Sequence, residues 1–271
     1  MRELLFTALE AAQAATAVHT RYAGTPALED AREKGTSDFV SRVDIQAQRA
    51  ALAVIRRDFP DHRIVAEEDD PDRIQAEGGA RGPASGPLWI VDPLDGTTNY
   101  LHGHPQYAAS VGVLVDGAPA AGAVMAGASG ERWWALRGGG AWKDGRRIRV
   151  SSVRALDRAL VGTGFPFKRH DFISAYLEQF GRVLPTSMGI RRGGSAALDL
   201  CALASGVLDA FWELVLKPWD IAAGLMILQE AGGTATRMDG SPLTLDRPES
   251  VLAGNSPELV EALDARLHDR K

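Results

Sequence analysis

The sequence predicts a mixed fold, with an α+β amino-terminal half followed by an α/β carboxyl-terminal half. In the first half, two long helical stretches precede a run of strands joined by short turns, an order typical of an α+β layer. In the second half, helical and strand stretches alternate along the chain. The chain has 271 residues, of which 45% are hydrophobic. A chain of that length can bury a large core without covalent staples.

The elements of the first half follow from hydrophobic spacing and from turn residues. Apolar residues recur at helical spacing over residues 3–23 and 42–58. Strands are predicted at residues 63–66, 88–91, 107–115, 120–126, 141–142 and 147–150. The pairs Asp116–Gly117 and Asp144–Gly145 mark the turns of two hairpins. Residues 70–87 are rich in Gly, Pro, Asp and Ala and predict a loop.

The elements of the second half alternate between strand and helix. Strands are predicted at residues 160–164 and 208–212, and a further strand is predicted to end at Arg191–Arg192. Helices are predicted at residues 173–180, 195–204 and 221–230. Ser256 is predicted to cap a final helix, with Pro257 in its first turn. We place a boundary near residue 152, which gives units 1–152 and 153–271. No flexible linker marks this boundary, so we expect two tightly packed halves with a site between them.

Composition and charge argue against several classes of function. The formal net charge of −5 and the pI of about 5.7 disfavour nucleic acid as the main ligand, because nucleic-acid-binding proteins usually present a basic face. A small anionic substrate is compatible, since a bound cation can invert the local field. The single cysteine, Cys201, excludes an intrachain disulfide and suits a cytoplasmic location. Glu3 and Glu10 interrupt any signal peptide, and no stretch reaches the ~18 apolar residues of a membrane helix.

The strongest local signal is the segment WIVDPLDGTTNY at residues 89–100. A buried strand delivers Asp92 and Asp95 at its carboxyl end, and Gly96 permits a sharp turn into a short helix begun by Thr97. Two carboxylates so close repel each other unless a cation lies between them, and Mg²⁺ prefers carboxylate, water and phosphate oxygens. The N–H groups of Gly96 and Thr97 can receive a phosphate. The structural alternative is an Asp-Pro turn followed by an Asp-Gly turn.

Three further acidic segments are KPWDIAAG at residues 217–224, IVAEED at 64–69 and EKGTSDFVSRVD at 33–44. Each has a functional and a structural interpretation. Asp220 precedes an apolar helix and could serve only as its N-cap. Glu67 and its neighbour end a strand and could be a solvated acidic edge. Ser37 or Asp38 could cap the helix that carries Asp44, without any function.

In this order and at this spacing, the four acidic segments resemble those of the inositol monophosphatase family. The segments RRGGSAALDLC and GFPF resemble its bacterial branch in particular. The resemblance runs from about residue 3 to about residue 265 and implies a layered αβαβα sandwich of the sugar-phosphatase type. It also implies a Mg²⁺-dependent phosphoric monoester hydrolase that uses two to three ions per site and forms no covalent intermediate.

The resemblance implies roles for individual residues. The metal ligands that it implies are Glu67, Asp92, the carbonyl of Leu94, Asp95 and Asp220. Glu67 and Thr97 would act as catalytic residues that position the attacking water, and Asp44 would orient Thr97. The substrate contacts that it implies are Asp95, Gly96, Thr97, Gly194, Ser195, Ala196 and Glu213. Positioning and charge neutralisation account for most of phosphoryl-transfer catalysis in any fold.

Rival interpretations remain within and outside this enzyme class. DPLDGT also resembles the haloacid dehalogenase phosphatases, but here the aspartates are three apart rather than two, and no Gly-Asp-Gly-x-Asn-Asp stretch follows. The predicted substrate is inositol 1-phosphate or a similar polyol phosphate, with histidinol phosphate, fructose 1,6-bisphosphate and 3′-phosphoadenosine 5′-phosphate as alternatives. A protein- or RNA-binding role rests only on Arg191–Arg192 and the basic run at 143–149. The resemblance further implies a homodimer and inhibition by Li⁺.

Overall fold

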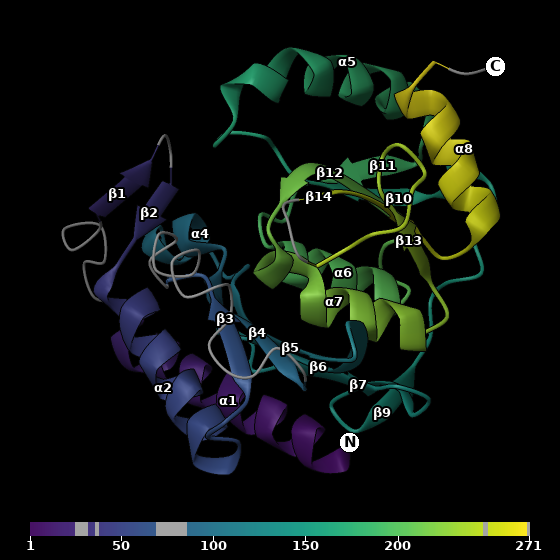
Figure 1. Cartoon of the computed structure of the whole chain (residues 1–271). Helices are drawn as coiled ribbons and strands as arrows, with labels where there is room; N and C mark the ends of the chain where they lie inside the picture. The colour runs from purple at the N-terminus through teal and green to yellow at the C-terminus, as the bar shows by residue number, and fades with distance from the viewer. Residues whose placement is uncertain (25–31, 36–37, 69–85, 246–248, 270–271) are drawn as a thin grey trace.

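The structure is a computed structural model, and it describes residues 1–271 except 25–31, 36–37, 69–85, 246–248 and 270–271. The helices are α1 (Arg2–Tyr22), α2 (Arg42–Asp58), α4 (Thr97–Leu101), α5 (Ile173–Val183), α6 (Ala196–Ala204), α7 (Pro218–Glu230) and α8 (Pro257–Leu267). The strands are β1 (Arg32–Gly35), β2 (Asp38–Val40), β3 (Arg63–Ala66), β4 (Leu88–Asp95), β5 (Ala108–Val115), β6 (Ala118–Ala126), β7 (Arg132–Leu136), β8 (Gly140–Lys143), β9 (Arg146–Ile148), β10 (Leu160–Thr163), β11 (Gly189–Arg191), β12 (Ala210–Leu216), β13 (Thr234–Thr236) and β14 (Glu249–Gly254). Figure 1 shows that helices and sheets alternate in layers.

The first sheet carries α1 and α2 on one face (Figure 1). Its order is β3-β4-β5-β6-β7-β8-β9, and only the β3–β4 pair is parallel. Side chains alternate between the faces of a strand. Trp89 and Val91 of β4 therefore pack against α1 and α2, whereas Ile90 between them packs with Ala222 of α7 on the other face.

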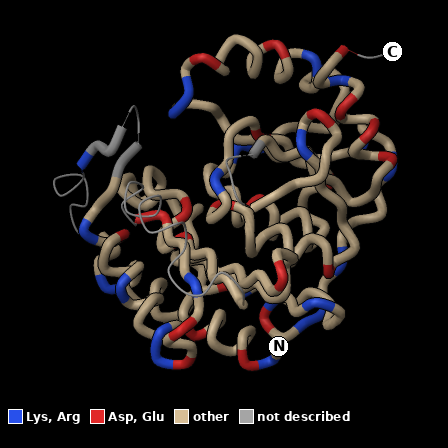
Figure 2. The backbone as a smooth tube through the Cα atoms, in the orientation of Figure 1, with Lys and Arg blue, Asp and Glu red and all other residues tan. Residues whose placement is uncertain are grey.

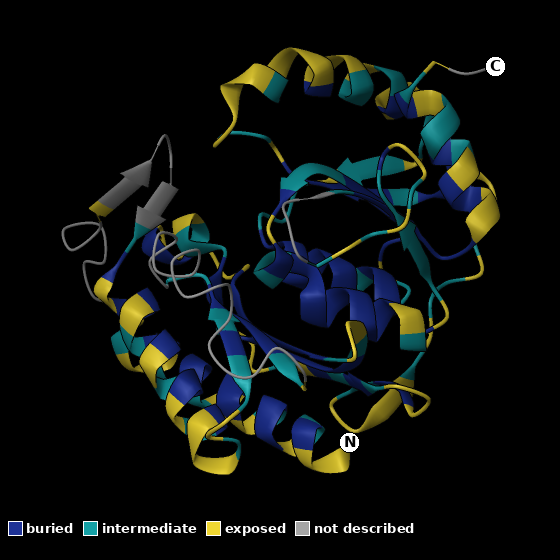
Figure 3. Ribbon diagram, viewed as in Figure 1, coloured by how far each residue is buried: buried dark blue, intermediate teal, exposed yellow. Residues whose placement is uncertain are grey.

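The helices α6 and α7 fill the layer between the two sheets, and Figure 3 shows them almost wholly buried. The second sheet has the order β11-β10-β12-β14-β13, and α5 and α8 cover its far face. Along β12, Phe211 packs with α6 and α7, whereas Ala210 and Trp212 pack on the side of α5 and α8. The layers therefore run helix, sheet, helix, sheet, helix, which confirms the predicted αβαβα sandwich.

A bulge in β4 decides which side chains share a face. Asp92 pairs with Ser110 and Asp95 pairs with Ala108, so three steps along β4 lie opposite two steps along β5. In a regular strand, residues three apart point to opposite faces. The extra residue turns Asp95 back to the face of Asp92, and Leu94 packs instead on the side of α2.

Most predicted elements are confirmed to within a few residues, and the main differences lie next to the acidic segments. The strand β4 runs to Asp95 instead of ending at Val91, and α7 begins at Pro218 instead of Ile221. The strands β1, β2, β7, β13 and β14 lie outside the predicted strands. Short strands give little periodicity, so a sequence pattern detects them poorly.

The two sheets divide along the chain. Strands of the first sheet end at Ile148, and strands of the second begin at Leu160. The helices α6 and α7 of the second half share one hydrophobic cluster with both sheets, so the two halves do not have separate cores. The boundary near residue 152 stays a prediction. The loop predicted over residues 70–87 lies almost wholly outside the described residues.

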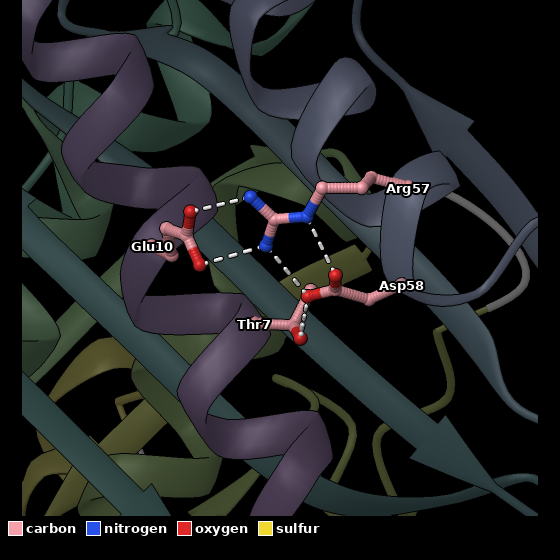
Figure 4. A network of polar contacts seen from close by, with 4 residues as sticks. All are labelled: Thr7, Glu10, Arg57 and Asp58. Atoms are coloured by element: carbon pink, nitrogen blue, oxygen red, sulfur yellow. Dashed lines mark hydrogen bonds and ion pairs between the residues drawn. The ribbon is translucent and has the colours of Figure 1, made fainter.

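A network of charged side chains joins α1 to α2 on the outer surface (Figure 4). The Nη1 and Nη2 atoms of Arg57 donate to the two oxygens of Glu10 at 2.8 and 2.9 Å, and its Nε atom donates to Asp58 Oδ1 at 2.7 Å. Hydrogen bonds from Arg57 and Thr7 lower the pKa of Asp58 to about 2. Water and salt screen such exposed pairs, so this network aligns the two helices more than it stabilises the fold.

Candidate active site

Three carboxylates from two elements meet on the α7 side of the first sheet. Asp92 and Asp95 come from the bulged end of β4, and Asp220 comes from the first turn of α7. Each offers an oxygen atom within 4.8 Å of oxygen atoms of the other two. Asp92 is 1% exposed and Asp95 is 8% exposed. Buried like charges at this separation repel strongly, so the cluster requires either bound protons or a cation.

Glu67 borders this cluster from the neighbouring strand. The parallel strands β3 and β4 place Ala66 beside Val91, and the Glu67 N–H donates to the Val91 carbonyl at 3.1 Å. The next residues along the two strands, Glu67 and Asp92, therefore lie side by side. Burial, together with the negative charge of Glu67, raises the pKa of Asp92 well above its ordinary value. Glu67 lies next to Asp92 but outside the close set of three oxygens.

The start of α6 holds the carboxylate of Asp95. The Ser195 hydroxyl donates to Asp95 Oδ2 at 2.5 Å, and the Ala197 N–H donates to the same oxygen at 2.8 Å. Burial raises the pKa of Asp95, and these two hydrogen bonds oppose that rise. Both donors meet Oδ2, which leaves Oδ1 for the cluster. Ser195, predicted as a substrate contact, is the N-cap of α6 and is only 1% exposed, with its hydroxyl engaged by Asp95.

Asp220 lies inside the first turn of α7 rather than before it. The helix begins at Pro218, so the interpretation of Asp220 as the N-cap is wrong. The Lys217 N–H donates to Asp220 Oδ2 at 2.6 Å, which satisfies one of the free donors of the helix end. Burial, together with the charge of Asp95, raises the pKa of Asp220 to about 7.

A hydroxyl–carboxylate pair lies at the end of the same strand. Thr97 Oγ1 lies 3.0 Å from Asp44 Oδ1 and 3.1 Å from the carbonyl oxygen of Leu94. The hydroxyl has one proton to donate, and a carboxylate attracts it more strongly than a neutral carbonyl does. The Leu94 carbonyl therefore keeps its lone pairs for another partner. The predicted contact between Thr97 and Asp44 is present.

Asp44 is fully buried at the start of α2. The N–H and the hydroxyl of Ser41 donate to Asp44 Oδ2 at 2.8 and 2.6 Å, and Ser41 Oγ accepts from the Val43 N–H at 3.1 Å. Ser41 is thus the N-cap of α2. The cap predicted at Ser37 or Asp38 is wrong, because Asp38 lies in β2; Ser37 itself lies outside the described residues.

Gly96 makes the turn between β4 and α4. Its φ of 89° and ψ of 36° lie in the left-handed region that favours glycine. A Cβ at this position would lie 2.7 Å from the carbonyl oxygen of Gln106 and 3.3 Å from that of Gly194. One turn further on, the Asn99 side chain donates to the Gly193 carbonyl at 3.0 Å. The turn after β4 is thereby fastened to the loop before α6.

Glu213 of β12 reaches the same site from the second sheet. It lies on the strand face of Phe211, which looks toward α6 and α7. Burial, together with the charges of nearby aspartates including Asp199 and Asp220, raises the pKa of Glu213 well above its ordinary value. Gly164 provides the room, because a Cβ there would overlap the Glu213 carboxylate.

Sequence reasoning missed three charged residues near the cluster. The guanidinium of Arg192 lies 5.0 Å from the ring centre of Phe165 and 5.4 Å from that of Phe167. Burial and the charge of Asp95 raise the pKa of Asp199 to about 8, and Arg192 opposes this rise. Burial raises the pKa values of Asp95 and Asp220, and the positive charge of Lys168 opposes this rise. The available signal for Asp199 was a carboxylate inside the apolar run of α6.

The residues present fit a divalent cation. Asp92 Oδ2 is buried, and no N–H or hydroxyl donor in the described part of the chain reaches it. Buried acceptors without a donor are rare in folded proteins, and a bound ion can satisfy one in place of a donor. Carboxylate oxygens are the ligands that Mg²⁺ prefers. Asp92, Asp95 and Asp220 therefore form a set that suits Mg²⁺, with Glu67 beside it.

We expect Mg²⁺ to raise the melting temperature more at pH 8 than at pH 6. A carboxyl whose pKa is higher in the folded than in the unfolded state stabilises the fold when protonated, and that stability is lost as the pH rises through the folded pKa. For Asp220 this pKa is about 7. The metal-free protein should therefore lose stability between pH 6 and pH 8, where ionised carboxylates repel each other and also bind Mg²⁺ best.

Differential scanning fluorimetry in EDTA and in Mg²⁺, at both pH values, checks this expectation. At about 100 times its dissociation constant, Mg²⁺ should add ~2.7 kcal/mol, or roughly 5–10 °C, at pH 8. An equal shift at both pH values would contradict the link between the cation and these carboxyl groups.

The chain is similar to known proteins over nearly its whole length. The model of the inositol monophosphatase family matches residues 1–270. The phosphatase IMPL1, chloroplastic, of Arabidopsis thaliana is 44% identical over 241 residues, which cover 85% of this chain and 62% of that protein. A putative Nus factor SuhB of Neisseria meningitidis serogroup B is 41% identical over 264 residues, which cover 97% of each. The solved structure of inositol monophosphatase from Anabaena is 34% identical, with a TM-score of 0.84 over 99% of this chain and 96% of that one.

None of the helices in the described part of the chain combines the length and the apolar character needed to cross a membrane.

Proposed function

The chain belongs to the inositol monophosphatase family, and on that premise we propose that it is a Mg²⁺-dependent phosphatase of small phosphate monoesters, with inositol 1-phosphate or a similar polyol phosphate as substrate. One observation carries the proposal: Asp92, Asp95 and Asp220 bring carboxylate oxygens within 4.8 Å of one another. Without a cation, the repulsion between these buried carboxylates destabilises the fold, and a bound cation removes that repulsion.

The ions would be held by Glu67, Asp92, the carbonyl of Leu94, Asp95 and Asp220. Bound Mg²⁺ neutralises the phosphate, lowers the pKa of water and stabilises the leaving alkoxide. The protein itself would bind the phosphate oxygens through the N–H groups of Gly96 and Thr97, which lie where α4 begins.

Thr97 and Glu67 would position the attacking water. The Thr97 hydroxyl donates a hydrogen bond to Asp44 Oδ1 at 3.0 Å, which leaves the lone pairs of Thr97 Oγ1 to accept a hydrogen bond from that water. Glu67, beside Asp92, would accept a second one. Two acceptors fix both protons of the water, so that its lone pair faces the phosphorus.

The alcohol part of the substrate would lie toward the second half of the chain. Glu213 would accept hydrogen bonds from hydroxyl groups of the substrate, and Gly194, Ser195 and Ala196, where α6 begins, would contact the alcohol part. The guanidinium of Arg192, held over two aromatic rings, would add a donor. An acceptor and a donor of this kind suit a polyol, whose hydroxyl groups both donate and accept.

Gly164→Ala is expected to raise the KM for the polyol phosphate about tenfold, with a smaller effect on kcat. The added methyl group would overlap the Glu213 carboxylate and displace it, and one lost hydrogen bond of this kind is worth ~1.4 kcal/mol, or a factor of ten. Gly181→Ala on α5 is the matched control, because a Cβ there meets no atom within 4 Å. Equal kinetics for the two variants would contradict the role of Glu213.

The experiment that tests the proposed function is phosphate release from four substrates: inositol 1-phosphate, histidinol phosphate, fructose 1,6-bisphosphate and 3′-phosphoadenosine 5′-phosphate. Each is assayed with Mg²⁺ and with EDTA. We expect Mg²⁺-dependent release concentrated on inositol 1-phosphate. Turnover concentrated on another of the four would keep the phosphatase and overturn the polyol assignment, and no release by folded protein would overturn both.

A second candidate function is that of a Nus factor, which the name of the Neisseria relative states. A non-catalytic role of this kind requires a docking surface. Arg146 and Arg147 are exposed on the β9 hairpin, but Figure 2 shows Lys and Arg spread over the molecule in this view rather than gathered on one face. An RNA affinity that falls steeply with salt and survives Asp95→Asn would favour this candidate. Absence of RNA binding at low salt would count against it.

A further inference from the structure

His19 of α1 is a fully buried polar residue behind the candidate active site. Its ring Nε2 lies 2.8 Å from the carbonyl oxygen of Pro93, in the bulge of β4. Its ring Nδ1 is buried without a hydrogen-bond partner among the described residues. None of the roles assigned to the site residues above requires an imidazole in this position, so its burial there indicates a separate role.

The contact with Pro93 fixes the protonation of the ring. A carbonyl oxygen can only accept a hydrogen bond, so Nε2 must carry a proton. Burial lowers the pKa of His19 to about 4, so the ring is neutral near pH 7 and Nδ1 carries no proton. The imidazole is therefore a neutral donor aimed at one backbone carbonyl.

That carbonyl belongs to the peptide unit that also holds Asp92. The unit consists of the Pro93 carbonyl and the Leu94 N–H, and the N–H donates to Asp92 Oδ1 at 3.0 Å. The bulge leaves this unit out of the regular pairing with β5. His19 on one side and Asp92 on the other therefore pin a single peptide plane. Because Oδ1 is engaged in this way, Oδ2 is the oxygen left for the cluster.

His19 is itself held in place by the segment that follows the site. The Tyr100 hydroxyl of α4 donates to the His19 carbonyl at 3.1 Å, and the His19 and Tyr107 rings meet edge to face at 5.7 Å between centres. A Cβ on Gly127 would overlap Tyr107 and lie 3.0 Å from His19 Nδ1. The ring thus has little freedom to turn away from Pro93.

We propose that His19 is a positioning residue for the cation site: it fixes the Pro93–Leu94 peptide and, through that peptide, the orientation in which Asp92 presents Oδ2. The inference rests on the proposed function, because it takes the cluster to bind Mg²⁺. Removal of a group that orients a metal ligand without contacting the metal typically weakens metal affinity by about 10- to 100-fold.

The test compares His19→Met with His19→Gln. The two replacements have similar length and volume, but only glutamine can donate a hydrogen bond to Pro93. Isothermal titration calorimetry of the EDTA-treated proteins with Mg²⁺ measures affinity without any assay of turnover. We expect the dissociation constant to rise at least about tenfold in the Met variant and to stay within about threefold of wild type in the Gln variant. Thr16→Val, a buried change one turn earlier on α1, should leave it unchanged.

The outcomes separate this inference from the proposed function. A wild-type protein that is folded but binds no Mg²⁺ overturns both. Wild-type affinity in a folded Met variant, or equal weakness in the Met and Gln variants, overturns the role of His19 alone. Long-range ¹H–¹⁵N spectra of the wild-type histidines test the same point without substitution. The neutral Nε2–H form of His19 is expected at pH 7, and the Nδ1–H form or a charged ring would overturn the proposal.

Discussion

Asp95→Asn is expected to lower phosphate release at least ~10³-fold while the fold stays intact, because removal of one ligand oxygen costs ~4 kcal/mol of transition-state stabilisation. Ser195 and Ala197 both donate to Asp95 Oδ2. In the variant, the single remaining oxygen serves these two donors. The new NH₂ group must then face Asp92 and Asp220, where its positive edge repels a cation.

Stability should move in the opposite direction to activity in this variant. The change removes one of several buried negative charges, so the metal-free protein should melt at the same or a higher temperature at pH 8. Phosphate release at saturating Mg²⁺ and a melting curve in EDTA measure the two effects. Asp116→Asn is the matched control, since it makes the same chemical change in the β5–β6 turn, where asparagine tolerates the φ of 55°. An Asp95→Asn protein that keeps more than a tenth of wild-type turnover would rule out this carboxylate as a metal ligand.

Thr97→Val is expected to lower kcat about 10²- to 10³-fold with little change in KM, because it removes the group that positions the attacking water. Valine has nearly the shape of threonine but no hydroxyl. The change also takes from the buried Asp44 the donor at 3.0 Å, and a lost hydrogen bond to a charged group costs ~1.5–3 kcal/mol of stability. Thr97→Ser keeps the hydroxyl and should recover kcat to within about tenfold.

The exposed neighbour Thr98 provides the control for this pair. Thr98→Val removes a hydroxyl one residue further along α4, where the side chain faces solvent, and should leave both kcat and stability unchanged. Steady-state kinetics and thermal melting of the three variants separate the effects. Equal kcat for Thr97→Val and Thr97→Ser would contradict the role of the Thr97 hydroxyl in positioning the water.

The sequence predicted the site's chemistry better than its geometry. Asp92 and Asp95 were recognised as a pair, because a buried strand that ends in two carboxylates is a local feature. Their common face was not predictable, since residues three apart on a strand point to opposite sides and only the bulge opposite Ala108 and Ser110 reverses this. The bulge depends on pairing with β5, which no local pattern specifies.

The parts that local patterns missed depend on contacts between distant segments. Arg192 and Asp199 lie in a recognised motif, but the proximity of Asp199 to Asp95 follows from the packing of α6 against the end of β4. His19 looked like one more residue of an alanine-rich helix, and its contact with Pro93 spans 74 positions. The α+β and α/β character of the two halves was predicted because long amphipathic helices and hairpin turns are local signals. The αβαβα layering was implied by the family resemblance, and the strands β13 and β14 were not detected.

The most direct test of the central claim is phosphate release from inositol 1-phosphate by EDTA-treated protein as Mg²⁺ is added back. We predict no release without the cation, a saturating rise as Mg²⁺ fills the site of Asp92, Asp95 and Asp220, and no such rise in Asp95→Asn. Release that proceeds equally well in EDTA, or a Mg²⁺ response that Asp95→Asn retains in full, would contradict this claim.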